Sequence, residues 1–202
     1  MEGITQVSMQ DKALADRGTT VRVLSLYQQG KDGKEIAGLL HIPLAAVHKI
    51  LEEADQKSRM VYVFVDGEEP ATVLDVRNFT QRIRIVNLTD ELTSRAFGIK
   101  AAPGWEDYEY FLESRCMPRT RYGIRRELKS MGIDCYDPFQ IIQKTRGRVY
   151  EDHQYLSRMD ADWIAGYDEI IKHTEDGRER TDKLKKYLQE SERAWKLDEG
   201  QY

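Results

Sequence analysis

The chain has 202 residues, of which 40 % are hydrophobic and 33 % are charged. No stretch approaches the roughly 18–20 apolar residues that a membrane-spanning helix needs, and the first residues lack the basic and apolar regions of a secretory signal. The two cysteines, Cys116 and Cys135, are too few for a disulfide framework or a four-cysteine zinc site. These features predict a cytoplasmic protein of one or two domains with no membrane partner.

The N-terminal part of the chain is predicted to consist of three helices. The apolar residues of 19–29 share one broad helical face, and Gly30 follows, where a glycine commonly ends a helix. Residues 34–40 and 44–54 predict two further short helices, and a proline opens the second of them. We expect a three-helix domain over residues 1–57.

The middle of the chain is predicted to form strands. β-Branched and aromatic residues dominate 60–65 and 71–76, and the Asp66-Gly67 pair between these segments is a turn signal. Residues 82–86 continue the pattern with alternating charged and apolar side chains. The three segments predict a three-stranded antiparallel meander.

Helices are expected again after the strands. Residues 105–115 carry aromatic and aliphatic side chains on one face. A second helix is expected over 118–131, ended by Gly132, and a third follows Asp137, whose side chain can cap it. Together with the strands, these helices form an expected domain over residues 58–158.

Residues 159–202 are predicted to form acidic amphipathic helices. One apolar stripe covers 163–171 and a second covers 184–195. The stripes can dock on the middle domain, pair two copies of the chain as a homodimer, or hold a partner. The elements therefore predict an α+β fold with N-terminal helices, an antiparallel sheet and a helical C-terminal region.

The most specific local pattern is GKEIAGLLHIPLAAVHKIL at residues 33–51. It resembles the helix-turn-helix of resolvase/invertase C-terminal domains and of sigma-factor-like modules. The small Ala37 stands where two helices would cross closely, and Ile36 and Val47 would fill the space between them. The turn position that usually holds glycine is His41, which tolerates a left-handed backbone better than a β-branched residue does.

The resemblance implies that the N-terminal part of the second helix enters the DNA major groove. His48 and Lys49 are the outward residues of this segment that offer side-chain hydrogen bonds to base edges. The segment lacks the Arg, Asn and Gln that give bidentate base readout, and residues 1–57 have a net charge of −1. The module therefore fits DNA binding with help from another surface, or a docking or dimer surface.

Charge is unevenly distributed along the chain. The formal net charge is −4, but residues 115–148 carry nine Lys and Arg against three Asp and Glu, and the segments on both sides are acidic. Such a block attracts phosphate or an acidic protein surface. The alternative is internal neutralisation by the flanking acidic segments.

Eight cations of this block are candidates for binding phosphate. They are Arg119, Arg121, Arg125, Arg126, Lys129, Lys144, Arg146 and Arg148. On the expected helix 118–131, Arg121, Arg125 and Lys129 recur every four residues and line one face. Arginine suits this role because its guanidinium forms a rigid fork for phosphates and carboxylates.

A second resemblance covers residues 95–152. Its core reads FLESRCMPRTR at 111–121, YDPF at 136–139 and TRGR at 145–148. It is similar to small proteins of unassigned activity in Clostridia-type Firmicutes and their mobile elements. The resemblance implies an origin in such bacteria or elements and indicates little about the chemistry of the protein. Some phage-borne anti-CRISPR proteins also join a helix-turn-helix to a partner-binding domain, which is an analogy of architecture.

The sequence indicates no strong catalytic, cofactor or metal site. The histidines are scattered, and both cysteines are expected to be buried apolar side chains. Residues 151–153, Glu-Asp-His, are expected to form a polar surface loop, because adjacent residues point apart and do not converge as a nuclease metal site requires. We expect a non-enzymatic DNA-binding protein of a phage or mobile element. The alternative is an anti-CRISPR-type inhibitor that binds a Cas nuclease complex.

Overall fold

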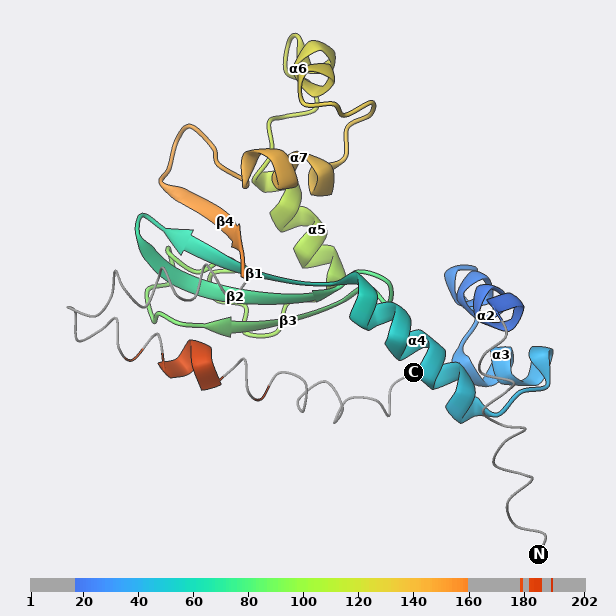
Figure 1. The fold of residues 1–202 in the computed structure, drawn as a ribbon. Helices are drawn as coiled ribbons and strands as arrows, with labels where there is room; N and C mark the ends of the chain where they lie inside the picture. Colours follow the sequence, from blue (N-terminus) through green and yellow to red (C-terminus); the bar gives the residue numbers. More distant parts are fainter. Residues whose placement is uncertain (1–16, 160–178, 180–181, 187–189, 191–202) are drawn as a thin grey trace, which may run out of the picture. The chain divides into compact units, whose positions relative to one another are not determined.

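The computed structural model describes residues 17–159, 179, 182–186 and 190. They belong to two compact units. The described part of the first unit consists of residues 17–59 and 78–80, and that of the second of residues 60–77, 81–159 and the described positions from 179 onward. The expected α+β layout is confirmed, with N-terminal helices, an antiparallel sheet and further helices (Figure 1). None of the described helices is long and apolar enough to cross a membrane.

The first unit has its core between α2 (Arg17–Gln28), α3 (Gly33–Leu40) and α4 (Leu44–Ser58). The hydrophobic side chains buried there are Val23, Ile36, Val47, Ile50 and Leu51. Isolated helices shorter than about 12 residues are marginal in water. The eight-residue α3 is therefore stabilised mainly by this packing.

Local hydrogen bonds fix both ends of α3. At its start, Asp32 Oδ1 accepts from Glu35 N at 2.8 Å and Glu35 Oε2 accepts from Asp32 N at 3.0 Å, which forms a capping box. At its end, His41 has a left-handed backbone with φ 54° and ψ 41°, and its N–H donates to the carbonyl of Ala37. This tight turn allows α4 to begin at Leu44.

The first unit also contains the turn between two strands, residues 78–80. The carboxylate of Asp55 is fully buried in α4, and it accepts hydrogen bonds from Thr80 N at 3.0 Å and Thr80 Oγ1 at 2.6 Å. The Phe79 ring stacks on Tyr27 of α2, with centroids 5.7 Å apart. The turn therefore supplies hydrogen bonds to a buried carboxyl group and extends the apolar core of α2, α3 and α4.

The second unit is built on a four-stranded antiparallel sheet in the order β3-β2-β1-β4. The strands are β1 (Arg59–Asp66), β2 (Glu69–Arg77), β3 (Arg82–Asn87) and β4 (Gln154–Arg158). The expected three-stranded meander is thus incomplete, because β4 pairs with β1 and places Leu156 opposite Phe64. Leu156 is the single buried side chain of β4, so the alternation that marks a strand is weak there.

One face of the sheet packs against α5 (Trp105–Ser114) and α7 (Pro138–Thr145), as Figure 1 shows. The core on this side joins Phe64 and Leu74 of the strands to Phe111 of α5 and Ile141 of α7. Phe64 and Phe111 meet edge to face with centroids 5.4 Å apart, an arrangement that aromatic pairs favour. Asp137 caps α7 as expected, accepting from Phe139 N at 2.9 Å.

The other face of the sheet buries Val73 and Leu88 against Leu184. Leu184 belongs to the helical segment 182–186 and is 2 % exposed. At this residue the second expected C-terminal stripe docks on the sheet. The first stripe, residues 163–171, and residues 187–189 and 191–195 of the second lie outside the described residues.

The helix expected over 118–131 is wrong at its N-terminal half. Helix α6 begins at Ile124 and ends at Ser130. Gly123 precedes it with φ 79°, a left-handed conformation through which an α-helix cannot run. Before it, Arg121 N donates to the Pro118 carbonyl at 3.0 Å in a separate turn.

Candidate nucleic-acid interface

The start of α4 presents few polar side chains. Lys49 is exposed, whereas the His48 ring packs against α3. Its Nε2 is shielded from solvent and lies 3.2 Å from the place that a Cβ on Gly33 would take. The structure corrects the expectation that His48 offers this nitrogen to a base edge. Lys49 of α4 is exposed, and its contact with DNA stays a prediction.

The broken helix changes the geometry of the basic block. Since Arg119 and Arg121 precede α6, they do not share a helical face with Arg125 and Lys129. Arg119 Nε donates to Glu113 Oε1 at 2.8 Å, and its guanidinium lies 4.7 Å from the Tyr136 ring centroid. Arg121 pairs with Glu127 at 3.5 Å. Two of the five expected phosphate ligands of this segment are therefore engaged within the protein.

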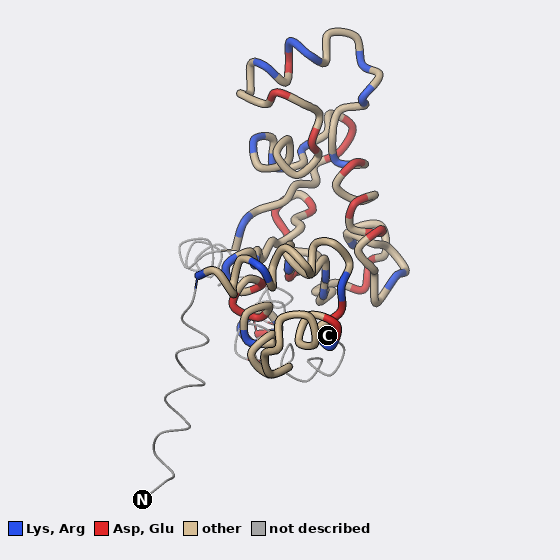
Figure 2. Tube along the Cα trace, turned by 90° about the vertical axis from the view of Figure 1, so that its right-hand side faces the viewer, with Lys and Arg blue, Asp and Glu red and all other residues tan. Residues whose placement is uncertain are grey.

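The remaining three cations of this segment lie on α6. Arg125, Arg126 and Lys129 are exposed and form no ion pair with any residue between 17 and 159. Tyr122, just before the helix, is fully exposed at 100 %. We call these four residues the α6 tip. Helix α6 lies beyond α7 from the sheet, and Figure 2 shows Lys and Arg positions along this segment at the top of the view.

Apolar side chains next to the α6 tip pack into the core of the second unit. Leu128 of α6 and Ile133 just after it are 5 % and 3 % exposed and belong to the same core as the sheet face. The Tyr136 hydroxyl donates to the Met117 carbonyl at 2.8 Å and ties the two ends of the projecting segment together. The exposed cations therefore stand on a fixed base, which lowers the entropy cost of binding an extended anion.

The three cations at the end of α7 have different environments. Lys144 is exposed in the last turn of the helix. Arg146 has a left-handed backbone with φ 58°. The Arg148 guanidinium lies 4.4 Å from the Tyr155 ring centroid, a cation–π contact. Of these three residues, Arg148 is therefore the one engaged with a ring of the protein.

Arg115, the first cation of the basic block, is structural. It is 7 % exposed and follows α5. Its Nε donates to the Gly147 carbonyl at 2.9 Å and its Nη2 to the Gln154 carbonyl at 2.7 Å. It also pairs with the carboxylate of Asp152 at 2.6 Å. The hydrogen bonds from Arg115 hold the pKa of the Asp152 carboxyl below its usual range.

Sequence reasoning missed this ion pair because Asp152 lies in the 151–153 segment, expected to be a polar surface loop. Exposed Glu151 and His153 fit that expectation, but Asp152 turns inward. Across the part of the chain that the structure describes, no three His, Cys, Asp or Glu side chains group as metal ligands would.

The two cysteines differ from each other. Cys116 is buried as expected, and burial raises the pKa of its thiol to about 12. Cys135 is exposed, which corrects the expectation that both are core side chains. Cys135 follows Ile133, which is 3 % exposed, so the chain turns outward within two residues.

No family model matches the chain, and no curated protein or solved structure matches it either.

Proposed function

We propose that this protein is a non-enzymatic DNA-binding protein that holds phosphates with its α6 tip. The observation that carries the proposal is the exposure of Arg125, Arg126 and Lys129, unpaired within residues 17–159, beside the fully exposed Tyr122. Most of the affinity of proteins for DNA comes from cations that replace counterions at phosphates. An exposed aromatic ring among such cations adds a surface on which a base can stack.

The first unit, with helices α2, α3 and α4, supplies a second contact surface in this proposal. Its resemblance to a helix-turn-helix supports an approach of α4 to the major groove, with Lys49 in reach of the DNA. Residues 17–59 carry seven Lys and Arg against five Asp and Glu. The first turn of α4 is Leu44-Ala45-Ala46, which offers no hydrogen bond to a base. We therefore expect weak sequence preference. The resemblance of residues 95–152 supports an origin in a phage or mobile element.

A salt titration of binding to a mixed duplex DNA library tests the proposal. The full chain is compared with a variant that carries Arg125→Ala, Arg126→Ala and Lys129→Ala. The logarithm of the affinity falls with the logarithm of the salt concentration by about 0.9 per phosphate contact. If all three cations contact phosphate, the slope of the triple variant is smaller by about 2.7.

A matched control carries Lys100→Ala, Lys183→Ala and Lys185→Ala, which removes the same formal charge from other places. Lys100 pairs with Asp107, and Lys183 pairs with Glu179 at 2.8 Å. The control keeps the slope of the unmodified chain if the α6 tip is the phosphate site. An equal reduction in both variants, or no binding by the unmodified chain at low salt, contradicts the proposal.

The second candidate function is an anti-CRISPR-type inhibitor that binds a Cas nuclease or another nucleic-acid-bound effector. Two exposed aliphatic side chains of the first unit favour a protein partner: Val21 is 65 % exposed and Leu39 is 57 % exposed. Inhibition of a Cas nuclease by the full chain, lost in a Val21→Ser and Leu39→Ser variant but kept in the α6 triple variant, supports this function over DNA binding.

A further inference from the structure

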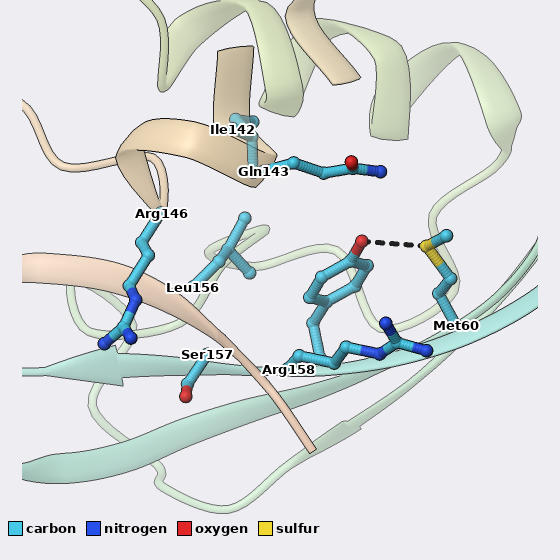
Figure 3. Close-up of a pocket in the computed structure, with 8 residues that line it drawn as sticks. Met60, Ile142, Gln143, Arg146, Leu156, Ser157 and Arg158 are labelled. Atoms are coloured by element: carbon cyan, nitrogen blue, oxygen red, sulfur yellow. Dashed lines mark hydrogen bonds between the residues drawn. The ribbon is translucent and has the colours of Figure 1, made fainter. Parts of the chain in front are cut away.

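A pocket of about 580 Å³ lies between α7 and the strands β1 and β4 (Figure 3). Its volume is in the range of sites that bind small organic ligands. The residues that line it are Met60, Tyr62, Ile142, Gln143, Arg146, Leu156, Ser157 and Arg158. The lining thus combines apolar side chains with two cations and contains no carboxylate.

Arg146 lines this pocket from a strained backbone. It caps α7 with φ 58° and ψ 24°. This left-handed conformation is unfavourable in free energy for any residue other than glycine. The position is fixed by two backbone hydrogen bonds of 2.7 Å, from Arg146 N to the Ile142 carbonyl and from Leu156 N to the Arg146 carbonyl. Strain of this kind persists where the surrounding structure determines it, and it often accompanies a binding role.

Arg158 lies at the other end of the pocket. Figure 3 shows Arg146 and Arg158 on opposite sides of Leu156. Arg158 stands opposite Tyr62 in the sheet, and the Tyr62 hydroxyl donates to Met60 Sδ at 3.0 Å. Neither guanidinium forms an ion pair with the described residues.

The backbone of Arg158 adds a donor at the same place. Met159 N donates to the Val61 carbonyl at 2.9 Å. In an antiparallel pair the N–H groups that point toward the neighbouring strand come from alternate residues, so those of β4 that point toward β1 alternate with those that point away from it. The N–H of Leu156 points outward and is taken by the Arg146 carbonyl. By the same alternation, the N–H of Arg158 points out of the sheet edge beside the pocket.

We propose that this pocket binds a nucleotide, with phosphate at Arg146 and Arg158 and the nucleoside between Ile142 of α7 and the strand residues Met60 and Leu156. Unpaired guanidinium groups at both ends suit a ligand with anionic groups on either side of an apolar body. The Gln143 amide offers one donor side and one acceptor side, which matches the edge of adenine. The site is distinct from the α6 tip, and either can fail alone.

Titration calorimetry of the full chain with adenosine, AMP and adenosine 3′,5′-bisphosphate tests the proposal. A hydrogen-bonded charge contributes about tenfold or more to affinity. We expect AMP to bind about tenfold or more tightly than adenosine, and the bisphosphate more tightly than AMP. No binding of AMP at millimolar concentration, or equal binding of AMP and adenosine, overturns the proposal.

Three variants locate the site. Arg146→Gly removes the guanidinium and suits the left-handed backbone, so this variant keeps the fold while its affinity for the bisphosphate falls about tenfold. Arg158→Gln gives a similar loss. Lys144→Gln removes the same charge from α7 outside the pocket and leaves affinity within twofold. A Lys144→Gln loss equal to that of the other two variants shows a diffuse charge effect and overturns the proposal.

The phosphate can come from a free nucleotide or from the end of a strand. A fluorescent AMP analogue bound to the full chain is challenged with a 5′-phosphorylated dinucleotide and with the same dinucleotide lacking the phosphate. Displacement by the phosphorylated form alone assigns a strand end to the pocket. Retention of the analogue against both assigns the free nucleotide. Nucleotide binding that persists in the α6 triple variant separates this site from the proposed DNA contact.

Discussion

The guanidinium of Arg115 donates hydrogen bonds of 2.6 and 2.9 Å to the two carboxylate oxygens of Asp152. The same guanidinium reaches the carbonyls of Gly147 and Gln154, so one side chain holds the end of α5 to the loop before β4. Removing one partner of a buried pair leaves a charge and several acceptors without compensation.

We therefore expect Arg115→Met to lower the free energy of unfolding by about 3 kcal/mol. Arg119→Met removes a charge from an exposed pair with Glu113 and costs about 0–1 kcal/mol. Urea denaturation followed by circular dichroism measures both. Equal losses in the two variants contradict a structural role specific to Arg115.

The Arg115–Asp152 pair also predicts a pH dependence. The hydrogen bonds from Arg115 hold the pKa of the Asp152 carboxyl below its usual range in the folded protein, so the folded state favours the ionised carboxylate. The stabilisation is present above the unfolded pKa and is lost as pH falls through the folded pKa. The difference in unfolding free energy between the unmodified chain and Asp152→Asn is therefore constant from pH 5 to 7 and shrinks below about pH 4. Urea titrations at each pH measure it, and a constant difference down to pH 2 contradicts the pairing.

The left-handed His41 predicts opposite effects for two substitutions in an exposed turn. His41→Gly relieves the backbone and raises the free energy of unfolding by about 0.5–1 kcal/mol. His41→Val places a β-branched residue at φ 54° and lowers it by about 1–2 kcal/mol. Thermal unfolding of both variants tests the order, and a valine variant at least as stable as the glycine variant contradicts it.

Substitution of Tyr122 distinguishes the contribution of base stacking to DNA affinity from that of charge at the α6 tip. Because its side chain is 100 % exposed, Tyr122→Ala leaves the melting temperature unchanged. Stacking contributes about 1–3 kcal/mol per base on single strands. We expect this variant to bind single-stranded DNA more weakly by that amount and to keep its salt dependence. Fluorescence anisotropy with single-stranded and duplex probes measures both, with Tyr110→Ala as a control at another exposed tyrosine.

The cysteines predict selective labelling. A thiol reagent at pH 8 should modify Cys135 rapidly, since it is exposed, and leave Cys116 unmodified in the folded state. Burial keeps Cys116 protonated, because its pKa is raised to about 12. Mass spectrometry of Cys135→Ser after labelling reads Cys116 directly. Rapid modification of that variant without denaturant contradicts the burial.

Local sequence signals predicted the parts of the fold that local chemistry determines. The positions of α2, α3 and α4 follow from apolar spacing and from residues that end or open a helix, such as Gly30 and Pro43, and the first three strands follow from residue type, alternation and the turn at Gly67. Strand β4 is not predicted from the sequence, because a short edge strand with one buried residue shows little hydrophobic periodicity. Helix α6 was extended too far because Gly123 was not recognised as a left-handed break.

The candidate site was predictable in composition but not in geometry. The sequence identifies the cations of the basic block, but the pairing of Arg119 with Glu113 and of Arg121 with Glu127 depends on turns that spacing does not reveal. The contact of Arg115 with Asp152 joins residues 37 positions apart, and it forms only when β4 is in place. Long-range contacts of this kind carry no local pattern.

The turn at residues 78–80 has a consequence for how the protein is made. Asp55 leaves the ribosome before Thr80, so its carboxylate has to wait for two strands to be synthesised before these hydrogen bonds can form. A nascent chain that stops at residue 59 contains α2, α3 and α4 but lacks Phe79 and Thr80. The N-terminal helices therefore complete their core during translation of the sheet, and not ahead of it.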